Sequence, residues 1–285
     1  MIPKSISPYI KLLRLPDHYA HIGPPLAAAI IIKTPLGWLL PWILGAICIA
    51  IVIAIINELV DRHDTDRYSD NPIHIKNAKI SIPQTLAMCV IFTILGFYFF
   101  YLSRLLPFAL IIFIIGIIYS IPPFRLKGRP GLDILCQIGA GFILPFVAPF
   151  SLANHIPSFI YPFILSLSLI ITAGLFPYQL ADFAADQKAG LSCTHIVLGM
   201  KKSLIMGFLL TLIGIFIYIY FDIFTSAPWS VPIIFISFYI LYKYYSWIPV
   251  RSQDAIHISL RNYVKTIRPV SFLFIPYLLI ILFWF

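Results

Sequence analysis

Residues 37–56 read GWLLPWILGAICIAIVIAII and run directly into NELVDRHDTDR at residues 57–67. The first stretch carries no charged side chain and has the length that an α-helix needs to cross the hydrocarbon core of a bilayer. The second stretch is strongly polar. Because acids close to hydrocarbon are costly, an apolar helix that ends in several acids predicts a membrane span with a functional site at one surface.

A second apolar run ends in the same way about 125 residues further along the chain, where residues 182–190 read DFAADQKAG. The two polar stretches hold six of the chain's 11 acidic residues: Glu58, Asp61, Asp64, Asp66, Asp182 and Asp186. Each stretch contains one polar pair at i, i+4 spacing, which a helix places on one face. The pairs are Asn57 with Asp61 and Asp182 with Asp186. This faint repeat predicts one shared site, since sites in membrane folds often lie between repeats.

The composition predicts an all-α, polytopic membrane protein. Hydrophobic residues make up 60% of the 285 residues, charged residues only 11%, and the mean hydropathy is +0.94. Soluble domains carry about 25% charged residues, and helices satisfy their own backbone in lipid. We expect one domain over residues 1–285 with nine transmembrane helices at 17–33, 37–56, 83–103, 105–121, 133–153, 157–180, 203–221, 229–247 and 268–285.

The basic residues predict the orientation of the chain. With the N-terminus inside, 18 of the 20 Lys and Arg residues lie in or beside cytoplasmic segments, and only Lys33 and Arg104 lie outside. Both acidic stretches then face the cytoplasm, as do polar loops predicted at 57–82, 122–132, 181–202 and 248–267. We expect a protein of a bacterial or archaeal cytoplasmic membrane without a cleavable signal peptide. Topology accounts for the net charge of +9, so no nucleic-acid partner is expected.

Cysteines and histidines are expected to play ordinary roles. No paired spacing of metal ligands occurs among the four cysteines, so we interpret them as packing residues: Cys48, Cys89, Cys136 and Cys193. His63 lies in the first acidic stretch, where a solvated loop position is favoured over a contact with phosphate. His18 and His21 have i, i+3 spacing but no evident third ligand.

The acidic stretches predict a site for Mg²⁺ and a diphosphate. Magnesium prefers hard oxygen ligands and is commonly held by carboxylates together with substrate phosphates. Such ions neutralise a diphosphate leaving group and so assist cleavage of its carbon–oxygen bond. The predicted metal ligands are Asn57, Asp61, Asp64, Asp66, Asp182 and Asp186. Basic residues nearby complete a predicted diphosphate clamp: Arg67, Arg125, Lys127 and Lys188.

In these motifs the chain resembles the UbiA superfamily of intramembrane prenyltransferases. Four residues match that family's second motif, DxxxDxxxGxxT: Asp182, Asp186, Gly190 and Thr194. Residues 119–127, YSIPPFRLK, resemble its YSxPPxRLK segment. The resemblance spans roughly residues 8–285.

The first motif departs from the family pattern NDxxDxxxD. Glu58 replaces an Asp, and Thr65 stands where the last acid is expected. Asp64 and Asp66 are therefore alternatives for that position. The departure leaves an altered reaction open.

The resemblance implies nine transmembrane helices in a ring around a lipid-open cavity. It also implies that an allylic prenyl diphosphate ionises with Mg²⁺ and that an electron-rich, lipophilic acceptor attacks the carbocation. Aromatic faces attract cations, and the candidate rings are Phe176, Tyr178, Phe183 and Tyr119. Tyr119 is favoured because it lies in the matched segment. The implied catalytic residues are Asn57, Asp61, Asp182, Asp186 and Tyr119.

The acceptor and the reaction have alternatives. Residues 125–133 and 182–190 are most similar to the carotenoid-elongase branch, and quinone or aromatic precursors, archaeal-type lipids and chlorophyll-type acceptors stay open. A membrane terpene cyclase, a transporter and an inactive scaffold are the rival functions. Transporter acids usually lie near the bilayer midplane, whereas these lie at cytoplasmic helix ends beside basic residues. That position favours a diphosphate.

Overall fold

The computed structural model describes residues 13, 19–61, 68, 81–153, 155–250 and 252–284. Every regular element in these residues is helical, which confirms the all-α fold class. The longer helices are α2 (Tyr19–Ile32), α3 (Leu36–Asp61), α5 (Ile82–Leu102), α6 (Leu106–Ser120), α9 (Ile160–Ala181), α12 (Met200–Tyr220), α14 (Val231–Trp247) and α15 (Gln253–Trp284). Shorter ones are α7 (Leu132–Ile138), α8 (Leu144–Val147), α10 (Phe183–Lys188), α11 (Thr194–Leu198) and α13 (Ile223–Ser226).

Five helical stretches in the described residues are long and apolar enough to cross a membrane. They are Gly37–Asp61, Ile82–Leu102, Leu132–Leu152, Ile160–Ala181 and Met200–Tyr220. The protein is therefore an integral membrane protein, as predicted. Each of the other predicted spans overlaps a helix of the structure, but those helices are shorter or less apolar.

The last helix is longer than the sequence analysis predicted. Because α15 begins at Gln253, the polar loop predicted at 248–267 is wrong over most of its length. One face of the added segment is buried, at i, i+4, i+7 and i+11: Ile256, Leu260, Tyr263 and Ile267. Polar residues occupy the remainder, so a search for continuous apolar runs misses this amphipathic helix.

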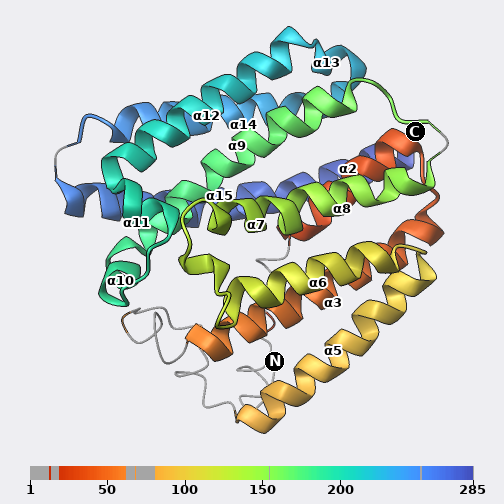
Figure 1. The fold of residues 1–285 in the computed structure, drawn as a ribbon. Helices are drawn as coiled ribbons and strands as arrows, with labels where there is room; N and C mark the ends of the chain where they lie inside the picture. Colours follow the sequence, from red (N-terminus) through yellow and green to blue (C-terminus); the bar gives the residue numbers. More distant parts are fainter. Residues whose placement is uncertain are drawn as a thin grey trace, which may run out of the picture.

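Within the described residues, six helices close a ring. α2 packs on α3, α3 on α6, α6 on α7, α7 on α9, α9 on α15, and α15 packs back on α2. α5 packs outside α3, while α12 packs on α9 and α14 on α12 (Figure 1). Glycine permits one of the close approaches, since a Cβ at Gly116 of α6 would lie 2.4 Å from Cδ1 of Ile53 of α3.

The polar segments gather at one end of this ring. The C-terminal end of α3, the link between α6 and α7, and the short helices α10 and α11 all lie at the left in Figure 1. The link contains a 3-10 turn at Leu126–Gly128. The two acidic motifs, far apart in the sequence, thus belong to the same end of the helix ring.

Candidate active site

The ring encloses an apolar cavity of about 580 Å³. Its wall comes from α2, α3, α5, α6, α7, α8, α9, α14 and α15. A π-helical turn at Gly139–Ile143 and 3-10 turns at Ala148–Leu152 and Pro228–Ser230 complete it. No charged side chain of the described residues lines it. Among the few polar groups in the wall, Gln137 Nε2 donates a hydrogen bond to the hydroxyl of Tyr119 at 2.7 Å. The cavity has the size and apolar character of a small-molecule site.

Two helix faces continue from the cavity wall into the acidic motifs. On α3, Ile53 lines the cavity, and Asn57 and Asp61 follow at four-residue steps. On α9, Tyr178 lines the cavity, and Asp182 follows four residues later, at the helix end. Four-residue steps keep side chains on one face of a helix. The polar pairs therefore extend the cavity wall beyond the same end of the ring.

The first motif is anchored to its neighbours by polar contacts. Asn57 Oδ1 accepts a hydrogen bond from Ser120 Oγ at 3.1 Å, which ties α3 to the end of α6. Asp61 is only 2% exposed. Its carboxylate forms ion pairs with Lys127 and with Arg125, whose Nη2 lies 3.5 Å from Oδ1. A buried carboxylate requires such compensation, so the two basic residues that we predicted to clamp a diphosphate neutralise Asp61 in this structure.

The backbone at Arg125 is strained. Its φ of 36° lies in the left-handed region, which residues with a Cβ rarely adopt. Strain of this kind persists only where surrounding contacts over-determine it, and it clusters at functional sites. Here the strained residue is one of the two cations that contact Asp61.

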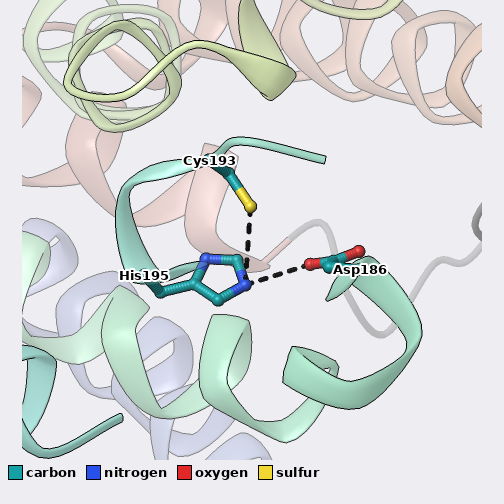
Figure 2. A group of neighbouring side chains, drawn as sticks. All are labelled: Asp186, Cys193 and His195. Atoms are coloured by element: carbon teal, nitrogen blue, oxygen red, sulfur yellow. Dashed lines mark hydrogen bonds and ion pairs between the residues drawn. The ribbon is translucent and has the colours of Figure 1, made fainter. Parts of the chain in front are cut away.

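The second motif presents two acids in different surroundings. Asp182 is exposed and lies between α9 and α10, whereas Asp186 lies within α10 and is 9% exposed. The backbone N–H of Asp186 donates to the carbonyl oxygen of Asp182 at 3.0 Å, so one helical turn carries both acids. Oδ2 of Asp186 lies 3.1 Å from Nε2 of His195 (Figure 2). Lys188, predicted to bind diphosphate, is exposed at the end of α10.

A buried acid to which the sequence analysis assigned no role joins α7 to the second motif. Asp133 is 1% exposed and accepts hydrogen bonds from the backbone N–H of Thr194, at 2.9 Å, and from its hydroxyl. The same Thr194 oxygen accepts a hydrogen bond from the backbone N–H of Gly131 at 2.7 Å. Thr194 thus has a structural role that its place in the motif alone did not reveal.

These contacts connect the two motifs. Lys127, which pairs with Asp61, lies on the link between α6 and α7, and Asp133 follows six residues later in the first turn of α7. Asp133 holds Thr194, and the next residue, His195, contacts Asp186. The link between α6 and α7 therefore sets the position of both acidic motifs.

A buried cysteine completes the surroundings of Asp186. Sγ of Cys193 lies 3.6 Å from Nε2 of His195. Burial, followed by the carboxylates of Asp186 and Asp133, raises the pKa of the Cys193 thiol to about 12. The thiol is therefore protonated at neutral pH. The sequence analysis missed this group, although Cys193 and His195 stand only two residues apart.

The candidate aromatic rings differ in position. Tyr119 and Tyr178 line the cavity, whereas Phe176 is buried in the packing between α9, α12, α14 and α15 and is not part of the cavity wall. The ring of Phe183 lies 6.0 Å from the imidazole of His195, centroid to centroid. Of the four rings, two thus face the space in which a substrate tail would lie.

Several predicted site residues lie outside the part of the chain that the structure describes. They are Asp64, Asp66 and Arg67, and His63 lies there too. The choice between Asp64 and Asp66 for the third acidic position of the first motif therefore stays a prediction.

Comparisons with known proteins identify relatives of this chain. The model of the UbiA prenyltransferase family matches residues 22–261. A solved UbiA homologue from Archaeoglobus fulgidus is 24% identical, with a TM-score of 0.71 and coverage of 96% of this chain and 99% of that chain. A structure of a UbiA homologue from the same organism bound to GPP and Mg²⁺ is 24% identical, with a TM-score of 0.68 and coverage of 98% and 99%.

A structure that concerns digeranylgeranylglyceryl phosphate synthase is also similar. It is 17% identical, with a TM-score of 0.67 and coverage of 97% of this chain and 99% of that chain. At these identities the likeness shows the fold alone. No curated protein sequence matches the chain.

Proposed function

Because this chain belongs to the UbiA prenyltransferase family, we propose that it transfers an isoprenyl group from an allylic prenyl diphosphate to a lipophilic acceptor within the membrane. Solved UbiA homologues from Archaeoglobus fulgidus bind GPP with Mg²⁺ and DMAPP with Mg²⁺. Both ligands are allylic diphosphates, which supports this donor class for the present chain.

One observation carries the proposal: an apolar cavity continues, along two helix faces, into two acidic motifs. A prenyl diphosphate has the same division, with a hydrocarbon tail and a charged head. The tail suits the uncharged wall, and the head suits the end at which Asn57, Asp61 and Asp182 extend that wall. Burial of the tail contributes about 0.8 kcal/mol per buried CH₂ group.

The residues at this end suit magnesium. Asn57, Asp61, Asp182 and Asp186 offer amide and carboxylate oxygens, the hard ligands that Mg²⁺ prefers. When bound, the ion neutralises charge on the diphosphate and makes it a better leaving group. Lys127 and Arg125, which neutralise Asp61 in this structure, lie where they can donate hydrogen bonds to phosphate oxygens.

The cavity wall then protects and directs the reactive tail. When the allylic carbon–oxygen bond breaks, its electron pair leaves with the diphosphate and the tail becomes a carbocation. The faces of Tyr119 and Tyr178 stabilise this cation electrostatically, and the apolar wall excludes water that would otherwise capture it. The acceptor supplies the electron pair for the new bond and afterwards loses a proton.

The uncharged cavity wall also indicates the chemical class of the acceptor. Because no charged side chain of the described residues lines the cavity, nothing there would pair with an aromatic acid, and a largely hydrocarbon acceptor is favoured. A carotenoid or a quinone or aromatic lipid precursor meets this description. By the positive-inside rule, the acidic motifs and the diphosphate face the cytoplasm.

The test uses the purified chain in nanodiscs with Mg²⁺. Radiolabelled dimethylallyl, geranyl, farnesyl and geranylgeranyl diphosphates are supplied with a lipid extract of the host membrane, and diphosphate release and label in lipid products are measured. We expect Mg²⁺-dependent transfer that Asp61→Asn and Asp182→Asn each reduce on the order of 100-fold or more. Asp222→Asn is the matched control, because Asp222 is an exposed acid beside α13, away from both motifs.

Each outcome discriminates among the functions. Label in an adduct identifies the acceptor and supports the proposal. Diphosphate release with labelled hydrocarbon and no adduct would instead indicate a membrane terpene cyclase. If the folded protein released no diphosphate from any donor, the prenyltransferase proposal would fail, and a transporter or scaffold role would be favoured.

A further inference from the structure

Three potential metal ligands of different chemistry converge at the second motif. Asp186, Cys193 and His195 are all buried, and one ligand atom from each lies within 4.8 Å of the others. Figure 2 shows the carboxylate and the thiol directed at the same side of the imidazole ring. The cluster combines an oxygen, a sulfur and a nitrogen atom, whereas the predicted Mg²⁺ ligands offer oxygen alone.

The cluster is not arranged as a nucleophilic triad. In such a triad the two ring nitrogens have separate partners, one bonded to the nucleophile and the other to the carboxylate. Here Oδ2 of Asp186, at 3.1 Å, and Sγ of Cys193, at 3.6 Å, both approach Nε2 of His195. Nδ1 is buried and has no hydrogen-bond partner among the residues that the structure describes. One nitrogen that faces two ligand atoms is the arrangement expected around a shared cation.

The distances suit a tetrahedral ion. Zinc–sulfur and zinc–nitrogen bonds of about 2.3 and 2.0 Å at a tetrahedral angle place the sulfur and nitrogen about 3.5 Å apart. The observed separation is 3.6 Å. Two ligands at about 2.0 Å lie about 3.3 Å apart, against an observed 3.1 Å between nitrogen and carboxylate oxygen. The sulfur and carboxylate oxygen lie within 4.8 Å of each other.

We propose that Asp186, Cys193 and His195 form a binding site for a thiophilic divalent cation of the zinc type, distinct in ligand chemistry from the oxygen site for Mg²⁺. Binding of the ion displaces the proton of the Cys193 thiol. The resulting thiolate and the carboxylate of Asp186 balance the charge of the dication, which the imidazole binds through Nε2. Three protein ligands are the number that open zinc sites use, with the fourth position left to water or substrate.

The surroundings of Nδ1 of His195 indicate how tightly the site should bind a metal ion. Metal-binding histidines usually donate their second ring N–H to a supporting group, and loss of that support weakens metal affinity by about 10–100-fold. Nδ1 of His195 has no such partner within the described part of the chain. We therefore expect reversible binding that a chelator removes, rather than a permanent structural metal.

Occupation of this site has a consequence that rests on the proposed function. Asp186 is also a proposed ligand of the magnesium ion that holds the diphosphate. A thiophilic ion that takes this carboxylate removes it from the oxygen site. We therefore expect zinc to inhibit the Mg²⁺-dependent reaction.

The binding test uses Co²⁺ as a spectroscopic substitute for Zn²⁺. The full chain in detergent micelles, stripped of metal and kept reduced, is titrated with Co²⁺. We expect a thiolate-to-cobalt charge-transfer band and the visible bands of tetrahedral Co²⁺, saturating at about one ion per chain and displaced by Zn²⁺. Cys193→Ser should remove the charge-transfer band. His195→Gln removes a direct ligand, so it should weaken binding by at least the factor of about 10–100 that loss of a supporting group costs.

Cys89→Ser is the matched control, since Cys89 lies in α5, outside the cluster and the cavity wall. It should leave the spectrum unchanged. Absence of the charge-transfer band in the wild-type chain, or an equal band in Cys193→Ser, would overturn the proposal. If Cys193→Ser does not fold, the wild-type spectrum and His195→Gln decide the question.

A separate assay tests inhibition. Diphosphate release by the wild-type chain at saturating Mg²⁺ is measured against Zn²⁺ concentration, and His195→Gln should need at least about 10–100-fold more Zn²⁺ for the same inhibition. Equal sensitivity of both chains would refute the inhibitory role. If no diphosphate is released at all, the proposed function fails, while the cobalt spectrum still decides whether the metal site exists.

Discussion

Asp133 and Thr194 form a two-point contact that holds the start of α7 against the segment after the second acidic motif. The backbone N–H of Thr194 donates to one carboxylate oxygen of Asp133 at 2.9 Å, and its hydroxyl donates to the other. Asp133 is 1% exposed, so no bulk water is available to replace a lost contact. The positions of the motifs relative to each other depend on this pair.

Replacement of Thr194 by Val should destabilise the protein. The change keeps the shape of the side chain but removes the hydroxyl that serves both Asp133 and the N–H of Gly131. Leaving buried polar groups unpaired costs about 1–3 kcal/mol. Chemical unfolding in mixed micelles measures the loss. Thr194→Ser, which retains the hydroxyl, should lie close to wild type, and equal stability of Val and wild type would contradict the contact.

Replacement of Lys127 should destabilise the protein, because Lys127 neutralises the buried carboxylate of Asp61. Lys127→Met leaves a carboxylate that is 2% exposed with Arg125 as its remaining cation. Breaking a buried ion pair by removing one partner costs about 3 kcal/mol. The double variant Lys127→Met with Asp61→Asn should lose less than the sum of the two single variants, because the second substitution removes the carboxylate that Lys127 neutralises. Strict additivity in the unfolding experiment would argue against the pair.

Filling the cavity at Gly174 should change the preferred donor. Gly174 lines the cavity, and a Cβ built there meets nothing within 4 Å. Gly174→Leu therefore places a side chain in the space of the prenyl tail without disturbing the helix packing. We expect the rate with geranylgeranyl relative to dimethylallyl diphosphate to fall by about tenfold or more. An unchanged ratio would show that the tail lies elsewhere.

Two glycine-to-alanine substitutions should change the free energy of unfolding in opposite directions. Gly174→Ala adds a methyl group to open space within α9 and should stabilise the helix by about 0.5–1 kcal/mol. Gly116→Ala should destabilise by about 1–3 kcal/mol, because its Cβ would lie 2.4 Å from Cδ1 of Ile53, at the contact of α6 with α3. Unfolding of both variants in the same micelles gives the comparison, and a shared sign would contradict this packing.

Tyr119 should contribute through its ring more than through its hydroxyl. Tyr119→Phe loses the hydrogen bond from Gln137 but keeps the aromatic face in the cavity wall. A cation–π contact in a desolvated site contributes about 2 kcal/mol, so Tyr119→Leu should lower kcat by about 30-fold while Tyr119→Phe stays within about threefold. Equal losses in the two variants would assign the effect to the hydroxyl.

Some elements were predictable because a local signal defines them. The apolar run that contains residues 37–56 predicts α3, since a helix in lipid must satisfy its own backbone. The end of that helix was placed too early, because Asn57 and Asp61 are polar yet continue the helix. The start of α15 was missed for a related reason: burial at Ile256 and Leu260 recurs with helical period, which a search for uninterrupted apolar runs does not register.

The features of the candidate site also divide into those that the sequence predicted and those that only the structure revealed. The spacing of Asp182 and Asp186 is a local pattern that the sequence shows directly. The contact of Asp186 with His195, by contrast, depends on how the chain turns between α10 and α11. The role of Asp133 could not be predicted from the sequence, because a single acid at the start of a helix is common. Only its burial against Thr194 distinguishes it.

The sequence by itself therefore determined the helical membrane architecture and the two acidic motifs, because hydropathy and i, i+4 spacing are local properties of the chain. Only the tertiary structure decided which groups meet: Lys127 with Asp61, Asp133 with Thr194, and the cluster around His195. The physical reason is that burial and pairing are set by helices that lie far apart in the sequence. The free energy of a buried charge depends on the partners that the folded chain brings to it.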